Sequence, residues 1–279
     1  MWNYENHEKV KKMILKNSEY YPYVCPLCKS NLKNLKLYYL CGNCRNKFII
    51  NNGIPDFFEP IKTENKNIIL ESIDTIDILA KIYETPFWYP LVYHAYGGMR
   101  IPSVNDTIKK ITGMLDVNNG LGLDIGCGTG LYTRSIAKKM DCVFGVDIST
   151  GMLNKAKKVA NQKNIRNIRL ARANVENLPF PNNIFNAACC SGALHLFSDT
   201  IKALKEISRV LKVGSPFAVM TFVRKRFLRH RFIYKHLKEK HGATIFDVNE
   251  LEKWLNIAGF RNFESKIYGS MILFRVKKK

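Results

Sequence analysis

The segment LGLDIGCGTG at residues 121–130 restricts the possible folds more than any other part of the sequence. It begins as a continuous apolar run and ends in three glycines at alternate positions, Gly126, Gly128 and Gly130. A short apolar run of this kind is typical of a buried parallel strand, and a glycine-rich turn after it is typical of a ligand-binding loop. The segment therefore predicts an α/β domain that binds a ligand at the end of this strand.

The sequence after residue 120 alternates strand-like apolar runs with amphipathic helical runs, which indicates a doubly wound parallel sheet. One apolar face is predicted for the helix around residues 201–211 and another for the helix around residues 251–258. The last two runs meet near Gly269 and predict an antiparallel hairpin. The candidate strands are GLGLDI, CVFGVDI, IRLARA, IFNAACC, PFAVMTFV, FRNFESKIY and SMILFRVK.

The spacing of the glycines discriminates among the ligands that such a loop can hold. The dinucleotide pattern Gly-x-Gly-x-x-Gly fails because Leu131 stands where its last glycine belongs, and no Gly-Lys-Ser/Thr follows for a nucleotide phosphate. Asp124, two residues before the first glycine, would repel a pyrophosphate but suits a ligand with an ammonium group and a sulfonium. The loop therefore favours S-adenosylmethionine.

The segment LDIGCGTG resembles motif I of the class I S-adenosylmethionine-dependent methyltransferases, including those with a methyltransferase type 11 domain. ANVENLPFPNNIFNAACCSGALHLFSD resembles the third- and fourth-strand region of that family. The resemblance implies a Rossmann-like α/β fold with a seven-stranded sheet and an antiparallel last strand. It departs from the family pattern at Asn174, where Asp is frequent, and at Asn186, where Asp is usual.

The resemblance also implies the residues of the cofactor site. Asp147 would bind the ribose hydroxyls, Asn174 and Val175 would lie at the adenine, and Ser191 would line the methyl-donor pocket. The complete expected set is Asp124, Gly126, Cys127, Gly128, Gly130, Asp147, Ile148, Met152, Asn174, Val175 and Ser191.

Two Cys-x-x-Cys pairs, Cys25 with Cys28 and Cys41 with Cys44, predict a metal site near the N-terminus. Each pair can present two thiolates to one tetrahedral ion, and four sulfurs close the shell of a Zn²⁺ ion, so the metal is expected to be structural. LKLYYL and KFII supply strands of a small zinc ribbon. The ribbon resembles that of the large-subunit ribosomal RNA guanine methyltransferases and of a group of bacterial and plastid methyltransferases.

Three parts are expected along the chain. Residues 1–60 form the zinc ribbon with an N-terminal helix, 61–115 a helical linker or lid, and 116–279 the S-adenosylmethionine-dependent methyltransferase domain. The aromatic stretch YETPFWYPLVYHAYGGMR within the linker is either a lid over the cofactor or a brace against the main domain.

The candidate catalytic residue is His195, which follows the predicted fourth strand. Methyl transfer is an in-line displacement that depends chiefly on alignment, and a general base is optional. An imidazole titrates near neutrality and suits that role, although His195 can equally be a packing residue. Cys189 and Cys190 at the end of the same strand are interpreted as buried thiols.

The formal charge of +21 suggests a polyanionic partner such as RNA or an anionic membrane surface, or simply a solvated lysine-rich surface. Residues 223–241, VRKRFLRHRFIYKHLKEKH, combine basic and aromatic side chains that can contact phosphates and bases. The same segment can equally form a solvated lysine-rich helix whose aromatic side chains pack inward. No apolar run is long enough to span a bilayer, and the protein is expected in the cytoplasm.

Three functional hypotheses follow. The first is an S-adenosylmethionine-dependent methyltransferase acting on a small molecule or on RNA. A narrower form of it is a ribosomal RNA guanine N-methyltransferase. The third is a non-catalytic protein that retains the fold and docks a partner through its zinc ribbon.

Overall fold

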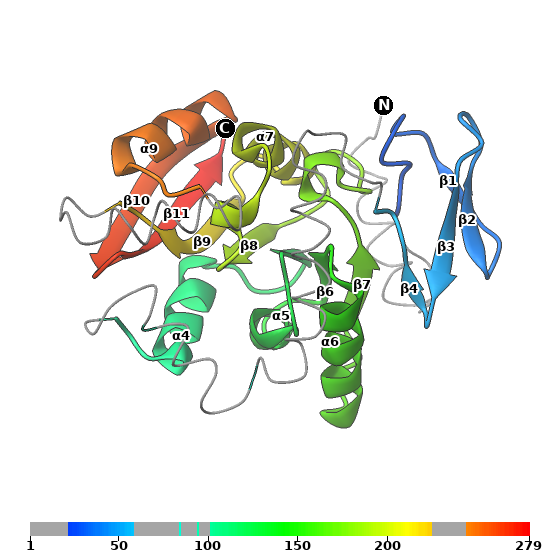
Figure 1. The fold of residues 1–279 in the computed structure, drawn as a ribbon, viewed down its shortest axis with the longest axis horizontal. Helices are drawn as coiled ribbons and strands as arrows, with labels where there is room; N and C mark the ends of the chain where they lie inside the picture. Colours follow the sequence, from blue (N-terminus) through cyan, green and yellow to red (C-terminus); the bar gives the residue numbers. More distant parts are fainter. Residues whose placement is uncertain (1–21, 59–83, 85–93, 95–100, 225–243) are drawn as a thin grey trace.

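The computed structural model describes residues 22–58, Glu84, His94, 101–224 and 244–279. These residues form a four-stranded sheet near the N-terminus and a seven-stranded sheet that is the centre of the molecule (Figure 1). The expected N-terminal helix, most of the aromatic stretch and most of the basic segment at 223–241 lie outside the described residues.

The large sheet has the strand order β10-β11-β9-β8-β5-β6-β7. Strands β5 to β9 are parallel, whereas β11 pairs antiparallel with both β9 and β10. The predicted seven-stranded sheet with an antiparallel last strand is therefore confirmed. Its strands are β5 (Leu121–Ile125), β6 (Cys142–Asp147), β7 (Ile168–Arg172), β8 (Ala187–Ser191), β9 (Pro216–Phe222), β10 (Phe260–Tyr268) and β11 (Met271–Lys278).

Helices cover both faces of this sheet. Helices α4 (Val104–Met114), α5 (Leu131–Ile136) and α6 (Thr150–Gln162) lie on one face, and α7 (Thr200–Val210) and α9 (Val248–Ile257) on the other (Figure 1). Ser149, Asp199 and Asp247 cap three of these helices by accepting backbone N–H bonds in the first turn. In the part of the chain described, no helix combines the length and apolar character needed to cross a membrane.

Strand β5 places the predicted ligand loop at the middle of the sheet. All five of its residues are buried between helices, as expected for a central parallel strand. The Asn186 side-chain oxygen accepts hydrogen bonds from the Leu121 backbone N–H at 3.0 Å and from Lys212 Nζ at 3.3 Å. An amide thus fixes the start of β5 at the position where the resemblance led us to expect a carboxylate.

The small sheet consists of β1 (Leu32–Asn34), β2 (Tyr38–Cys41), β3 (Lys47–Asn51) and β4 (Ile54–Pro55). It lies beside β7, at the edge of the large sheet (Figure 1). The Asp56 carboxylate binds Arg172 at 2.9 Å, and the Phe57 N–H donates to the Arg172 carbonyl oxygen at 2.7 Å.

Aromatic rings join the ribbon to the large sheet. The Tyr23 ring lies 4.8 Å from Phe57, 5.5 Å from Phe180 and 6.2 Å from Phe144 of β6, measured between ring centroids. All four side chains are almost fully buried in one hydrophobic cluster. The ribbon and the edge of the main sheet therefore share a core, so the ribbon's structure and that of the adjoining loops depend on each other.

Candidate cofactor-binding site

The structure brings the predicted site residues together along one edge of the sheet. Strands β7, β6, β5 and β8 are neighbours and parallel, so their carboxyl ends share this edge. Gly126, Asp147, Asn174 and Ser191 each lie at or just after one of these ends. The chain reverses its direction of winding at β5, and such a switch point is where open α/β sheets bind ligands.

The three glycines of the loop all adopt left-handed backbone conformations, with φ of +63° at Gly126, +51° at Gly128 and +80° at Gly130. A Cβ atom on Gly126 would lie 2.4 Å from the Cβ of Ala193, so no side chain fits there. A Cβ on Gly128 would meet no atom within 4 Å. The loop therefore packs closely at its start and is open at its tip, which leaves room for a ligand to approach the backbone.

Asp147 connects the end of β6 to the tip of this loop. Its carboxylate accepts the Gly128 N–H at 2.8 Å and the Ser149 N–H at 2.9 Å. The side chain is half-buried. A carboxylate at this position can exchange a backbone donor for the hydroxyl groups of a ligand, which is the role expected from the resemblance.

Asp124 lies behind the loop, with only 1% of its surface exposed. One carboxylate oxygen accepts the Thr133 hydroxyl at 2.5 Å and the other accepts Cys189 Sγ at 3.0 Å. Burial, opposed by the hydrogen bond from Thr133, raises the pKa of Asp124 to about 6. Because both oxygens already accept hydrogen bonds, Asp124 stabilises the conformation of the loop. It can contact a ligand only if one of these hydrogen bonds breaks.

The cysteines near the loop are buried. Burial raises the pKa of Cys127, Cys189 and Cys190 above the usual value of a thiol. Buried thiols of this kind are poor nucleophiles. Their environment agrees with the interpretation of Cys189 and Cys190 as core residues.

Asn174 and its neighbours border the candidate site next to the carboxyl end of β7. The Asn174 side-chain oxygen accepts the Glu176 N–H at 2.9 Å and caps the short helix η1 (Val175–Asn177). Val175 and Met152 are buried, and Ile148 is half-buried. These residues lie after neighbouring strands, on the side of the site opposite to Ser191.

Ser191 ends β8 with a buried hydroxyl that has no hydrogen-bond partner among the described residues. A buried unsatisfied hydroxyl is costly, and one at the edge of a ligand site indicates that a ligand completes its bonding. The glycine loop, the carboxylate of Asp147 and this hydroxyl therefore fit a polar cofactor.

His195 lies in the short helix η2 (Leu194–Leu196), which follows β8. Its ring packs edge-on against Phe222, at 5.3 Å between centroids, and Nδ1 lies 3.4 Å from the Thr221 hydroxyl. Burial lowers the pKa of His195 to about 4, so the imidazole is neutral at pH 7. This environment is that of a packing residue that is also a weak base.

Arg134 and Glu84 were not expected at the site from the sequence. Arg134 Nη1 donates to the Thr129 carbonyl oxygen of the glycine loop at 2.7 Å, and Nη2 bonds both carboxylate oxygens of Glu84 at 2.9 and 2.8 Å. Arg134 is only 6% exposed. The position of Arg134, one helical turn after the last glycine, was the only sign in the sequence that it contacts the loop. Nothing in the sequence identified Glu84 as its partner.

The four cysteines of the ribbon converge on one point. Their Sγ atoms all lie within 4.8 Å of one another, with Cys25 to Cys44 and Cys28 to Cys41 both at 3.5 Å. A tetrahedral zinc ion with Zn–S distances of about 2.3 Å separates its sulfurs by about 3.8 Å. The four thiols therefore fit a closed zinc shell, as the spacing predicted.

Comparison with known proteins agrees with this geometry. The sequence model of the family described as "Methyltransferase domain" matches residues 123–214. An uncharacterized chloroplast methyltransferase of Arabidopsis thaliana is 30% identical over 172 residues, which cover 58% of this chain and 48% of that protein. The demethylmenaquinone methyltransferase of Corynebacterium kroppenstedtii is 38% identical over 100 residues, which cover 36% of this chain and 41% of that protein.

The chain thus spans about half, or less, of the length of these curated relatives. Among solved structures, phosphoethanolamine N-methyltransferase 2 of Haemonchus contortus, in complex with S-adenosyl-L-methionine, superposes with a TM-score of 0.59 at 16% identity. The superposition covers 72% of this chain and 59% of that one.

The seven-stranded sheet with its antiparallel last strand has the class I fold of S-adenosylmethionine-dependent methyltransferases such as this neighbour. In sequence, residues 123–214 are similar to the methyltransferase domain family whose model they match. The domain is preceded by a four-cysteine ribbon.

Proposed function

We propose that the chain binds S-adenosylmethionine at the edge formed by β7, β6, β5 and β8 and transfers its methyl group to an acceptor. The observation that carries this proposal is the open, left-handed Gly128 whose N–H is bonded to Asp147 at 2.8 Å. A carboxylate bonded to the accessible tip of the glycine loop supports a role for Asp147 in binding ribose hydroxyls. When bound, S-adenosylmethionine supplies an electrophilic methyl group on a sulfonium.

The chain's own residues would bind and orient this ligand. Asp147 would accept the ribose hydroxyls, while Asn174 and Val175 would border the adenine. Asp124 would fix the loop from behind through Thr133, and the Ser191 hydroxyl, which has no partner among the described residues, would bond to the ligand or the acceptor. His195, neutral at pH 7, is the candidate to accept a proton from the acceptor.

A small acceptor is the first candidate substrate class. The demethylmenaquinone methyltransferase that matches over 36% of this chain acts, by its name, on demethylmenaquinone. The apolar surroundings of His195, with Phe222 at 5.3 Å, suit such an acceptor more than a charged one.

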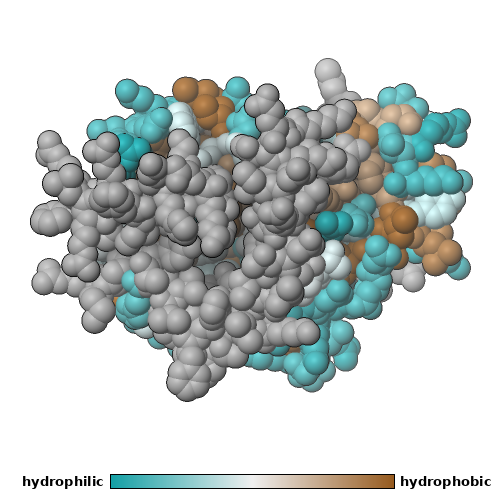
Figure 2. Space-filling model, viewed as in Figure 1, coloured by the Kyte–Doolittle hydropathy of each residue, from teal (hydrophilic) through white to brown (hydrophobic). Residues whose placement is uncertain are grey.

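RNA is the second candidate, and the ribbon surface supports it. The described residues 22–58 contain five basic side chains and only one acidic side chain, and Lys33, Lys36, Arg45 and Lys47 are exposed. Lys47 Nζ lies 5.3 Å from the centroid of the Tyr38 ring. On the face seen in Figure 2, hydrophobic and hydrophilic residues lie side by side on this part of the molecule. Basic and aromatic groups together suit single-stranded RNA.

We propose zinc as the structural ion of the four cysteines, because four convergent sulfurs leave no open coordination position for catalysis. Metal analysis of the purified protein tests this, with one equivalent of zinc expected. A purified protein that contains no metal and is still folded would contradict this proposal.

Transfer of radiolabelled methyl groups from S-adenosylmethionine tests the proposed activity. The acceptors are the RNA, protein and small-molecule fractions of cells that lack this protein, and the Asp147→Ala variant is the matched control. Label is expected in one fraction and only with the wild-type protein. Label in RNA, with an affinity for RNA that falls steeply with salt, would select the second candidate. Equal labelling by both proteins, or none in any fraction, would contradict the proposal.

A further inference from the structure

We propose that Glu206 of helix α7 and the first cysteine pair of the ribbon together hold the loop at residues 174–182 in its ligand-binding shape. Glu206 is then a positioning residue for the adenine side of the cofactor site, and the ribbon is part of that site's support. This inference rests on the proposed binding of S-adenosylmethionine, because Asn174 and Val175 of this loop are the expected adenine neighbours.

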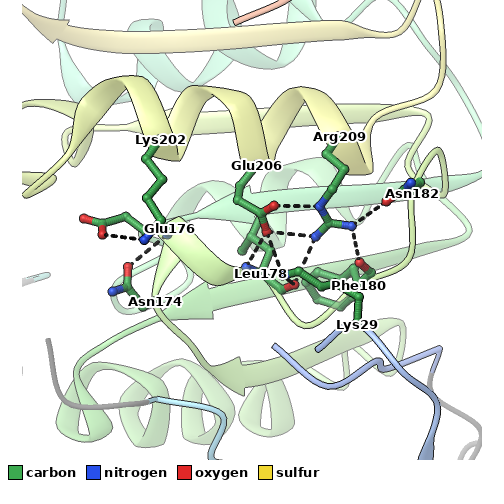
Figure 3. Close-up of polar contacts among 9 residues, drawn as sticks. All are labelled: Lys29, Asn174, Glu176, Leu178, Phe180, Asn182, Lys202, Glu206 and Arg209. Atoms are coloured by element: carbon green, nitrogen blue, oxygen red, sulfur yellow. Dashed lines mark hydrogen bonds and ion pairs between the residues drawn. The ribbon is translucent and has the colours of Figure 1, made fainter. Parts of the chain in front are cut away.

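Glu206 is the centre of a network that joins three parts of the chain (Figure 3). Its Oε2 accepts the Leu178 backbone N–H at 2.9 Å and Lys29 Nζ at 3.1 Å. Arg209, one turn further along α7, donates to both carboxylate oxygens at 2.7 and 2.8 Å. One carboxylate therefore connects the loop, the ribbon and the helix.

Arg209 binds the same loop at three further points. Its guanidinium donates to the carbonyl oxygens of Phe180 at 2.7 Å and Leu178 at 3.1 Å, and to the Asn182 side-chain oxygen at 2.8 Å (Figure 3). Leu178 and Phe180 are fully buried, so these backbone groups have no access to solvent. The planar fork of an arginine can satisfy several acceptors at once, which a lysine cannot.

The ribbon reaches the loop from both sides of its first cysteine pair. Lys29, the residue after Cys28, donates to the Leu178 carbonyl oxygen at 3.3 Å. Val24, the residue before Cys25, donates its backbone N–H to the Pro179 carbonyl oxygen at 3.0 Å. Each of these bonds is one residue away from a metal ligand. The conformation of the cysteine pair therefore determines where the middle of the loop lies.

Helix α7 also holds the beginning of the loop. Glu176 Oε1 accepts the Asp199 N–H at the start of α7 at 3.0 Å, and Oε2 lies 3.7 Å from Lys202 Nζ. Asn174 accepts the Glu176 N–H and so links this contact to the expected adenine residues (Figure 3). The loop is thus fixed by α7 at both ends and by the ribbon at its middle.

The charges in this network are mostly removed from water. The exposed fractions of the side chains are 14% for Glu206, 20% for Arg209 and 35% for Lys29. Burial alone would raise the pKa of Glu206, but hydrogen bonds from Arg209 and the charges of Lys29 and Arg209 hold it below its usual value. Removing one partner from such a group leaves an uncompensated charge, so the loop should shift to find water or another partner.

The test is the affinity of the purified, zinc-loaded protein for S-adenosylhomocysteine and for 5′-methylthioadenosine, measured by calorimetry. Glu206→Gln and Lys29→Met should each weaken both ligands by the same factor, roughly 3- to 30-fold, because both ligands carry the adenosine part. Lys29→Met keeps all four cysteines and an unbranched side chain that lacks only the terminal ammonium group. Glu264→Gln, which removes a carboxylate paired with Arg275 on the exposed hairpin, is the matched control and should change neither affinity.

A purely structural role would lower the unfolding temperature and leave both affinities unchanged at temperatures where the protein is folded. Arg209→Lys, which keeps the charge and loses the fork, provides a second variant if Glu206→Gln does not fold. If the wild type binds both ligands and their affinities are unchanged in Lys29→Met and in the α7 variant, this inference is overturned and the proposed function is not. Absence of binding by the wild-type protein would overturn the proposed function and this inference with it.

Discussion

Replacing Asp124 by asparagine should make the stability of the ligand-free protein less sensitive to pH. Asp124 is buried, and its two oxygens accept bonds from Thr133 and Cys189. Asparagine has nearly the same shape, and one of its two polar atoms can still accept while the other donates to the remaining partner. The substitution therefore removes the titration of a buried carboxyl group with little change in packing.

The size of the effect follows from the pKa of Asp124, which burial raises from 3.8 to about 6. Between these values the folded state binds the proton more tightly than the unfolded state, so the contribution of Asp124 to stability falls as pH rises. The full loss is about 3 kcal/mol, and about 1 kcal/mol of it falls between pH 5 and pH 7. The free energy of unfolding of Asp124→Asn, relative to the wild type, should rise by that amount over this interval.

Urea unfolding of both proteins at half-unit steps from pH 5 to pH 8 measures this difference. Asp116→Asn is the control for the loss of one formal negative charge, because the Asp116 side chain is 82% exposed. A difference between Asp124→Asn and the wild type that is independent of pH, or that falls as pH rises, would refute the raised pKa of a buried Asp124.

Three further perturbations have defined outcomes. Gly126→Ala places a Cβ 2.4 Å from the Cβ of Ala193 at a φ of +63°, so urea unfolding should show a loss of stability of about 1–3 kcal/mol. Unchanged stability would contradict the tight packing of the loop. Removal of zinc with a chelator should lower the unfolding temperature, and adding zinc back should restore it in the wild type but not in Cys41→Ser. In the wild type, acidification from pH 7 to pH 5 should lower the free energy of unfolding by about 2 kcal/mol through His195, because the unfolded state binds the proton more tightly than the buried ring. His195→Asn should lose this part of the pH dependence. An identical dependence of stability on pH in both proteins would contradict the burial of His195.

The fold could be predicted from the sequence because its signals are local. Strands β5 and β9 coincide with runs of mainly apolar, fully buried residues, and the strictly alternating glycines of residues 126–130 are confined to one turn. The spacing of the two cysteine pairs likewise predicted the convergence of four Sγ atoms. In each case, residues a few positions apart determine the structure of one turn or one strand.

Contacts between distant parts of the chain could not be predicted in the same way. Arg134 and Glu84 are 50 residues apart, and Lys29 and Glu206 are 177 apart. No periodicity links such pairs, since their meeting depends on how the ribbon and the helices pack on the sheet. The position of Asp124 before the glycines suggested a contact with a cationic ligand, whereas in the structure its oxygens accept hydrogen bonds from Thr133 and Cys189. These two partners are known only from the folded arrangement.

Calorimetric titration of S-adenosylhomocysteine into the wild-type protein and into Asp147→Ala tests the central claim most directly. Asp147 holds the tip of the glycine loop through the Gly128 N–H and is the expected partner of the ribose. The wild type should bind one equivalent, and Asp147→Ala should remain folded and lose at least about tenfold in affinity, which is the value of one charge-assisted hydrogen bond. A wild-type protein that releases no heat, or a variant that binds with equal affinity, would contradict the assignment of this edge as the cofactor site.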